Sequence, residues 1–134
     1  MNDASRAHTT AFLVRDYECD LQGVVNNAVY LNYLEHARHE FLKSRGLDFA
    51  AITASGIRLV VARAELDYHA SLTSGDNFHV HTSFAREGRL KFLFRQHVIR
   101  DSDGKKMLSA TITAAALNEQ GRPFDPGEVL EGLY

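Results

Sequence analysis

Asp20 stands seven residues before Asn27, within the stretch YECDLQGVVNNAVYLNYLEHAR that runs from Tyr17 to Arg38. The residues after Asn27 have the apolar spacing of a long helix, so Asp20 lies just ahead of a helix N-terminus. Such a terminus offers N–H donors without partners and about half a positive charge. An acid in that place can be a structural cap, or it can be a reagent that attacks a substrate or activates water.

The helix itself is predicted from apolar side chains at i, i+3, i+4 and i+7 spacing over five turns. Asn26 or Asn27 can cap its start, and Gly46 suits the position just after its end. A short second helix is expected at about residues 48–54. The apolar positions of the long helix are Tyr30, Tyr33, Leu34, Ala37, Phe41 and Leu42.

The segments on either side of the long helix alternate with period two, which predicts strands. Short turns, such as the one around Asp103 and Gly104, make the later strands antiparallel neighbours. One long helix and about five strands predict an α+β fold whose sheet curls around the helix. A tail over residues 118–134 is expected to end in a small helix after Pro126. The strand segments are HTTAFLVRD, the run from Arg58 to Tyr68, DNFHVHTSF, RLKFLFRQHVIRD and KMLSATITAAALN.

The composition describes an ordinary globular chain: 134 residues, 45% hydrophobic and 24% charged, with a net charge of −2. That length predicts a single domain. A nucleic-acid partner is not expected, because lysine and arginine form no basic run. Cys19 is the single cysteine and suits a reducing compartment. Neither a leader nor a spanning segment is expected, which predicts a cytoplasmic protein without a membrane partner.

The stretch DYECDLQGVVNNAVYLNYLEHAR resembles the signature of hot-dog-fold acyl-CoA thioesterases of the 4-hydroxybenzoyl-CoA thioesterase type. The shared features are the acid, a glycine three residues on, a small apolar pair, and a helix with Tyr, Leu, Glu and Arg at these spacings. The likeness extends over about residues 9–117. It implies one hot-dog domain over residues 1–134, in which an antiparallel sheet of about five strands wraps around one long central helix.

The resemblance implies that Asp20 is the catalytic carboxylate, acting as nucleophile or as general base, and that the backbone N–H of Asn27 polarises the thioester carbonyl. The chemistry is sound, because a donor at that oxygen contributes about 3–4 kcal/mol in the transition state. Gly23 permits a tight turn and leaves room for the thioester. Glu35 is the second candidate carboxylate, although it can also form a solvated ion pair with Arg38.

The implied substrate is an acyl- or aroyl-coenzyme A that threads between the helix and the sheet. Relatives bind the nucleotide phosphates with basic side chains at a strand start. The expected substrate contacts are Val25, Asn26, Tyr30, Arg89 and Lys91, although the two basic residues can equally well form a solvated strand end.

An exposed strand edge and the resemblance together predict a homodimer or a homotetramer. No metal or redox cofactor is expected, because the pairs His36/His39 and His79/His81 lack a third ligand and coenzyme A is part of the substrate. Two rivals stay open: a hot-dog dehydratase or hydratase, and a catalytically silent acyl-CoA binder. The first needs a histidine facing the acyl chain, yet residues 16–33 contain none. The identity of the acyl group is also open.

Overall fold

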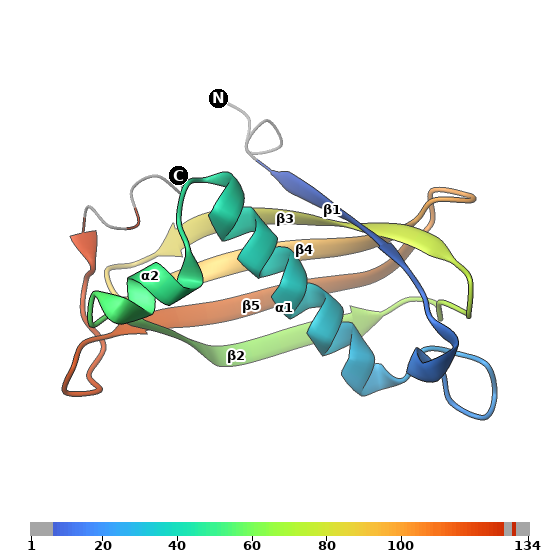
Figure 1. Cartoon of the computed structure of the whole chain (residues 1–134), viewed down its shortest axis with the longest axis horizontal. Helices are drawn as coiled ribbons and strands as arrows, with labels where there is room; N and C mark the ends of the chain where they lie inside the picture. Colours follow the sequence, from blue (N-terminus) through green and yellow to red (C-terminus); the bar gives the residue numbers. More distant parts are fainter. Residues whose placement is uncertain (1–6, 128–129, 131–134) are drawn as a thin grey trace.

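The computed structural model describes residues 7–127 and residue 130. Five strands form one antiparallel sheet in the order β1-β3-β4-β5-β2, and α1 lies across one face of it (Figure 1). This is the expected hot-dog arrangement. The predicted helix after Pro126 falls mostly outside the described residues. The elements are β1 His8–Leu13, the 3-10 turn η2 Asp16–Glu18, α1 Asn27–Ser44, α2 Phe49–Ala54, β2 Arg58–Tyr68, β3 Asn77–Glu87, β4 Lys91–Arg100 and β5 Lys106–Leu117.

The long helix α1 forms as its spacing predicts, because all six of its apolar positions are buried. It ends in a left-handed residue, Gly46, with φ +78°. The N–H of Gly46 donates to the carbonyl of Lys43, and the N–H of Leu47 donates to the carbonyl of Leu42 at 2.9 Å. These two bonds satisfy carbonyls that the last turn would otherwise leave open, so the chain turns sharply toward α2.

The sheet packs the inward sides of β3, β4 and β5 against α1. On β3 the side chains of Phe78, Val80 and Thr82 are fully buried, as the period-two pattern predicts. The strands β3, β4 and β5 are consecutive antiparallel neighbours joined by short turns. Within the described residues, none of the helices combines the length and the apolar character needed to span a bilayer.

The strand β2 is the edge of the sheet and pairs with β5 alone among the described strands. Its pairing register shifts between Val61 and Arg63, so the strict alternation expected for this strand is broken by a bulge. Three large apolar side chains stay exposed on it, Val60 at 36%, Val61 at 52% and Tyr68 at 47%. A long, partly apolar free edge is a surface that another strand can pair with.

Candidate active site

Asp20 lies in a tight loop that joins η2 to α1. The N–H of Asp20 donates to the carbonyl of Val24, and the N–H of Gly23 donates to the carbonyl of Asp20. The Oδ1 atom of Asp20 accepts from the backbone N–H of Gln22 at 2.9 Å and from that of Val24 at 3.3 Å. Gly23 has φ +81°, a conformation that glycine adopts without steric cost. The loop is therefore built around the acid, with the glycine where the backbone needs it.

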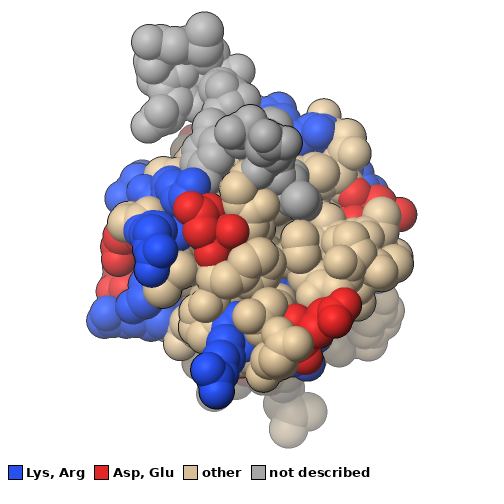
Figure 2. Space-filling model, turned by 90° about the vertical axis from the view of Figure 1, so that its left-hand side faces the viewer, with Lys and Arg blue, Asp and Glu red and all other residues tan. Residues whose placement is uncertain are grey.

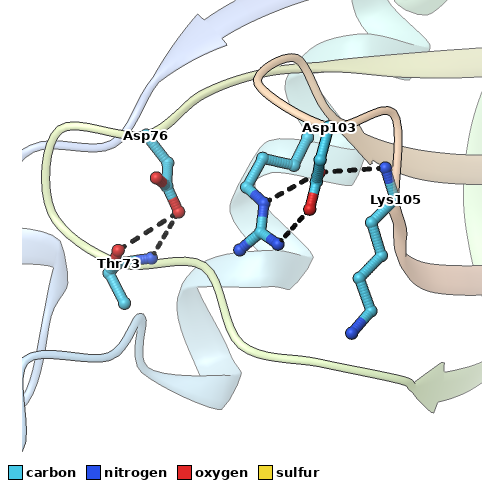
Figure 3. A network of polar contacts seen from close by, with 5 residues as sticks. Thr73, Asp76, Asp103 and Lys105 are labelled. Carbon is cyan, nitrogen blue, oxygen red and sulfur yellow. Dashed lines mark hydrogen bonds and ion pairs between the residues drawn. The ribbon is translucent and has the colours of Figure 1, made fainter.

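Buried contacts fix this loop to the rest of the protein. Val25 is a core residue with 3% exposure, and its N–H donates to the carbonyl of Leu72 at 2.9 Å. Tyr30 is also in the core, and its hydroxyl accepts from the N–H of Leu72 at 2.9 Å. The segment that contains Leu72 is itself closed by Asp76, whose carboxylate accepts from the N–H and the hydroxyl of Thr73 (Figure 3). Val25 and Tyr30, expected as substrate contacts, thus position the loop.

The start of α1 presents backbone donors that have no partner in the part of the chain that the structure describes. Asn26 occupies the N-cap position, yet its exposed side chain makes no capping hydrogen bond. Among the described residues, the N–H groups of Asn27 and Ala28 donate no hydrogen bond either. The hydroxyl of Tyr68, at the end of β2, donates to the carbonyl of Asn27 at 3.3 Å. The helix tip is therefore tied in place while its amides remain open to an incoming oxygen atom.

The carboxylate of Asp20 is held by its own loop and accepts no hydrogen bond from the amide of Asn27 in this structure. Its Oδ2 atom accepts no hydrogen bond from the described residues, which leaves one carboxylate oxygen for a substrate. The neighbouring Cys19 is a poor competitor as nucleophile. Partial burial, together with the carboxylates of Asp16 and Asp20, raises the pKa of its thiol.

A cavity of about 190 Å³ lies between α1 and β2. Glu35 and Arg38 both line it, but they do not form the ion pair that their spacing suggests. Arg38 turns inward instead, and its Nη1 donates to Oε1 of Gln96 on β4 at 3.1 Å. Sequence reasoning missed Gln96, although a glutamine on the inward side of a strand, between Phe94 and Val98, is a signal for a buried polar contact. Asp20 does not line this cavity.

Arg89 and Lys91 lie at the hairpin between β3 and β4, at the opposite end of the sheet from Asp20. Figure 2 looks onto this end, where Lys and Arg side chains gather on part of the surface. The strand β3 has 11 residues and so separates the two ends by about 35 Å. One chain therefore does not bring these two basic residues together with Asp20.

Among the described residues, no three His, Cys, Asp or Glu side chains are grouped so that they could hold a metal ion. The His79 ring instead pairs with Asp101, with Nδ1 and Oδ1 separated by 2.6 Å.

A sequence model of the thioesterase-like superfamily matches residues 14–131. The chain belongs to this superfamily. It is 37% identical to the acyl-acyl carrier protein thioesterase ATL2 of Arabidopsis thaliana over 87% of this chain and 62% of that protein. A putative esterase of Aquifex aeolicus is 34% identical over 90% of this chain and 92% of that protein. The chain spans about three fifths of the length of ATL2 and of its Arabidopsis counterpart ATL3.

Solved structures of similar proteins share the fold. A hypothetical protein from Aquifex aeolicus matches with a TM-score of 0.87 and 30% identity, over 95% of this chain and 99% of that one. The 1,4-dihydroxy-2-naphthoyl-CoA thioesterase of Synechocystis matches with a TM-score of 0.87 and 17% identity, over 93% of both chains. The hot-dog architecture expected of a superfamily member is therefore confirmed.

Proposed function

We propose that this protein hydrolyses the thioester of an acyl- or aroyl-coenzyme A, with Asp20 as nucleophile or general base. The observation that carries the proposal is the pair of open amides at Asn27 and Ala28, beside a loop that is built around Asp20. Among the relatives, ATL2 is named for acyl-carrier-protein thioesters and FadM of Escherichia coli for long-chain acyl-CoA. Both names describe cleavage of a thioester.

In the general-base form, the thioester carbonyl oxygen accepts a hydrogen bond from the N–H of Asn27. A water oxygen attacks the carbonyl carbon while its proton passes to the Asp20 carboxylate. The carbon–sulfur bond then breaks, and the proton passes to the departing thiolate, which gives a free acid and coenzyme A. In the nucleophilic form, the Asp20 carboxylate attacks the carbonyl carbon, the carbon–sulfur bond breaks, and coenzyme A leaves as a thiolate. Water then hydrolyses the resulting mixed anhydride, which releases the free acid, restores the carboxylate and supplies the proton that the thiolate takes up. Neither form uses a metal or a redox cofactor, and the negative charge develops at the helix tip, where it is stabilised most.

The proposed functional unit contains two copies of the chain. Arg89 and Lys91 can bind the phosphates of the same coenzyme A only if they come from a different copy than Asp20. Antiparallel pairing of β2 with β2 of a second copy places opposite ends of the two sheets side by side. The helix tip of one copy then lies at the end where the other copy carries its basic hairpin. A homodimer, or a tetramer built from it, follows.

The two rivals are less well supported. Dehydration chemistry needs a histidine beside the acyl chain, and the loop and first turns around Asp20 contain none. A silent binder is less well supported because an unpaired carboxylate beside a thioester serves no purpose in binding it. A cytoplasmic location is part of the proposal, since the thiol of Cys19 is free.

The test is an Asp20→Asn variant, which keeps an oxygen that can accept from Gln22 and Val24 and so preserves the loop. We expect turnover of acyl-CoA, followed by thiol release, to fall by about 100-fold or more while acyl-CoA binding is unchanged. Asp48→Asn is the matched control, because asparagine caps α2 as well as aspartate does. Full turnover in Asp20→Asn, or a loss confined to Glu35→Gln, would move the chemistry away from Asp20.

A further inference from the structure

We propose that the cavity between α1 and β2 receives the far end of the acyl group, and that Arg38 there selects acyl groups that carry an oxygen acceptor. This inference rests on the proposed thioesterase function and narrows its substrate class. The preferred substrates are short acyl groups with an oxo, hydroxyl or carboxylate group near the distal end, in place of plain alkyl or unsubstituted aryl groups.

The position of the cavity fits the end of an acyl chain. Leu59, Val60 and Val61 line it from the first half of β2. When β2 pairs antiparallel with β2 of a second copy, the Tyr68 end of the second copy's strand lies beside this half of the first copy's strand. The helix tip of the second copy lies there as well. A thioester held at the tip therefore points its acyl group into the cavity of the neighbouring copy.

The size of the cavity limits the group that fits. Its volume is about 190 Å³, and apolar cavities of about 150 Å³ bind one benzene ring. A single ring with a small substituent, or a chain of about six carbons, fills such a space. Most of the wall is apolar, with Leu42, Phe94 and Ala114 added to the β2 residues.

A chain of hydrogen bonds aims the guanidinium of Arg38 at this space. Gln96 is fully buried, and its Nε2 donates to the carbonyl of Leu34 and to the hydroxyl of Thr82, both at 3.0 Å. With both hydrogens of that amide used, only Oε1 of Gln96 is left for Arg38, whose Nη1 donates to it at 3.1 Å. This chain of hydrogen bonds holds Gln96 and Arg38 rigidly, because it is attached to the sheet through Thr82 and to the helix through Leu34.

The guanidinium keeps donors to spare. Of its five N–H groups, one is used by Gln96. Within residues 7–127 and 130, no carboxylate oxygen lies within 4.0 Å of the guanidinium nitrogens. Burial lowers the pKa of Arg38, against the opposing effect of the Glu35 carboxylate, which agrees with a cation that is only partly compensated. Among the described residues, the buried side-chain N and O atoms without a partner do not include those of Arg38, so its spare donors are open to solvent. They become costly when an acyl group displaces that water and offers no oxygen in its place.

Plain acyl groups would fill the cavity but leave those donors without partners. A site built to hydrogen-bond a substrate oxygen discriminates strongly against the analogue that lacks it. A substrate with an oxo group distinguishes the effect of Arg38 from that of Glu35. A ketone oxygen accepts hydrogen bonds but has no proton to donate to a carboxylate. His39 also lines the cavity and can donate to an oxo group, so the Arg38 variants decide which of the two donors gives rise to the preference.

The experiment compares matched coenzyme A thioesters: hexanoyl with 5-oxohexanoyl, and benzoyl with 4-hydroxybenzoyl. We expect the wild-type kcat/KM to favour the oxygenated member of at least one pair by about tenfold or more. Arg38→Met should bring that ratio close to one, and Arg38→Lys should retain part of it because the charge stays while the planar fork is lost. A wild-type ratio of one or less on both pairs overturns the inference, whether or not the Arg38 variants fold.

Binding separates this inference from the proposed function. The probes are thioether analogues of the same pairs, with a methylene between sulfur and carbonyl so that hydrolysis is impossible. Calorimetry on the wild type should give a tighter Kd for the oxygenated analogue even if no thioester is cleaved, in which case the function fails and the selectivity stands. Equal Kd values, with or without hydrolysis, refute the role of Arg38.

Discussion

The hydroxyl of Tyr68 donates to the main-chain carbonyl of Asn27 at 3.3 Å, which ties the end of the edge strand β2 to the first turn of α1. The same ring packs edge-on against Tyr30, with 5.5 Å between ring centroids. Since the amides beside that carbonyl are the proposed oxyanion donors, the geometry of the helix tip depends on the strand edge. This link couples the surface that we propose for dimer formation to the chemistry.

Tyr68→Phe tests that link. The variant keeps the ring contact with Tyr30 and loses one half-exposed hydrogen bond, so the free energy of unfolding should fall by about 0.5–1 kcal/mol. We expect kcat to fall several-fold with little change in KM, because the oxyanion donors lose orientation while the binding surface stays. Urea unfolding and steady-state kinetics measure the two effects. Wild-type kcat in Tyr68→Phe would mean that the helix tip holds its position without the strand.

Gly23→Ala tests whether the loop around Asp20 must keep its shape. Alanine in this left-handed conformation costs about 1–2 kcal/mol, and a Cβ there meets no atom within 4 Å, so the cost lies in the backbone alone. Gly104→Ala is the matched control, since Gly104 also has positive φ and open space. Thermal unfolding should show similar losses of stability for both variants, whereas hydrolysis should fall only for Gly23→Ala. An equal fall in hydrolysis would trace the effect to stability.

The helices and the β4–β5 turn could be predicted from the sequence because each is specified by residues that are close together in the chain. The apolar spacing from Tyr30 to Leu42 reports one helix face, and the same residues bury that face. The short helix expected at about residues 48–54 is α2, which spans Phe49–Ala54, with Asp48 as its N-cap accepting from the N–H of Ala50. Gly104, in the predicted turn between β4 and β5, has φ +70°.

Contacts between distant segments could not be predicted in the same way. Arg38 has Glu35 as its neighbour at i, i+3, which favours a surface ion pair, but it reaches Gln96, 58 residues away. The strands β2 and β3 follow one another in the chain, yet β4 and β5 lie between them in the sheet. Neither arrangement follows from periodicity, because each depends on which buried polar groups and strand edges meet after the chain has collapsed.

Asp103→Asn tests the hairpin between β4 and β5, where Asp103 accepts from Nε and Nη2 of Arg100 at 3.0 and 2.5 Å and from the N–H of Lys105 at 3.1 Å (Figure 3). The Arg100 hydrogen bonds, followed by that of Lys105, lower the pKa of Asp103 from 3.8 to about 2. A lowered folded-state pKa stabilises the fold above about pH 4, and this contribution disappears as the pH falls toward 2. Thermal unfolding should show a gap between the wild type and the variant at pH 6 that closes at pH 2. A constant gap over this range would contradict the assignment.

Mixing two inactive variants tests whether each site is shared between copies. In the proposed dimer, Asp20 of one copy acts with Arg89 and Lys91 of the other. Asp20→Asn and a double variant with Arg89→Glu and Lys91→Glu should each lose most activity at low substrate concentration. After the two proteins are mixed, unfolded and refolded together, half of the dimers should be mixed, and each mixed dimer should contain one intact site of two. Hydrolysis should then recover to about a quarter of the wild-type rate.

The control for this mixing experiment places all three substitutions on one chain and refolds it with Asp20→Asn. No arrangement of these two chains restores an intact Asp20, so no activity should return. The mass in solution, measured by light scattering, should be that of a dimer or a tetramer for each variant in these mixtures, because residues 20, 89 and 91 lie outside β2. If the subunits have exchanged but the first mixture regains no hydrolysis, then Asp20 and the phosphate-binding residues lie on the same chain. Since the strand β3 separates them by about 35 Å, a different set of basic residues would then have to bind the nucleotide.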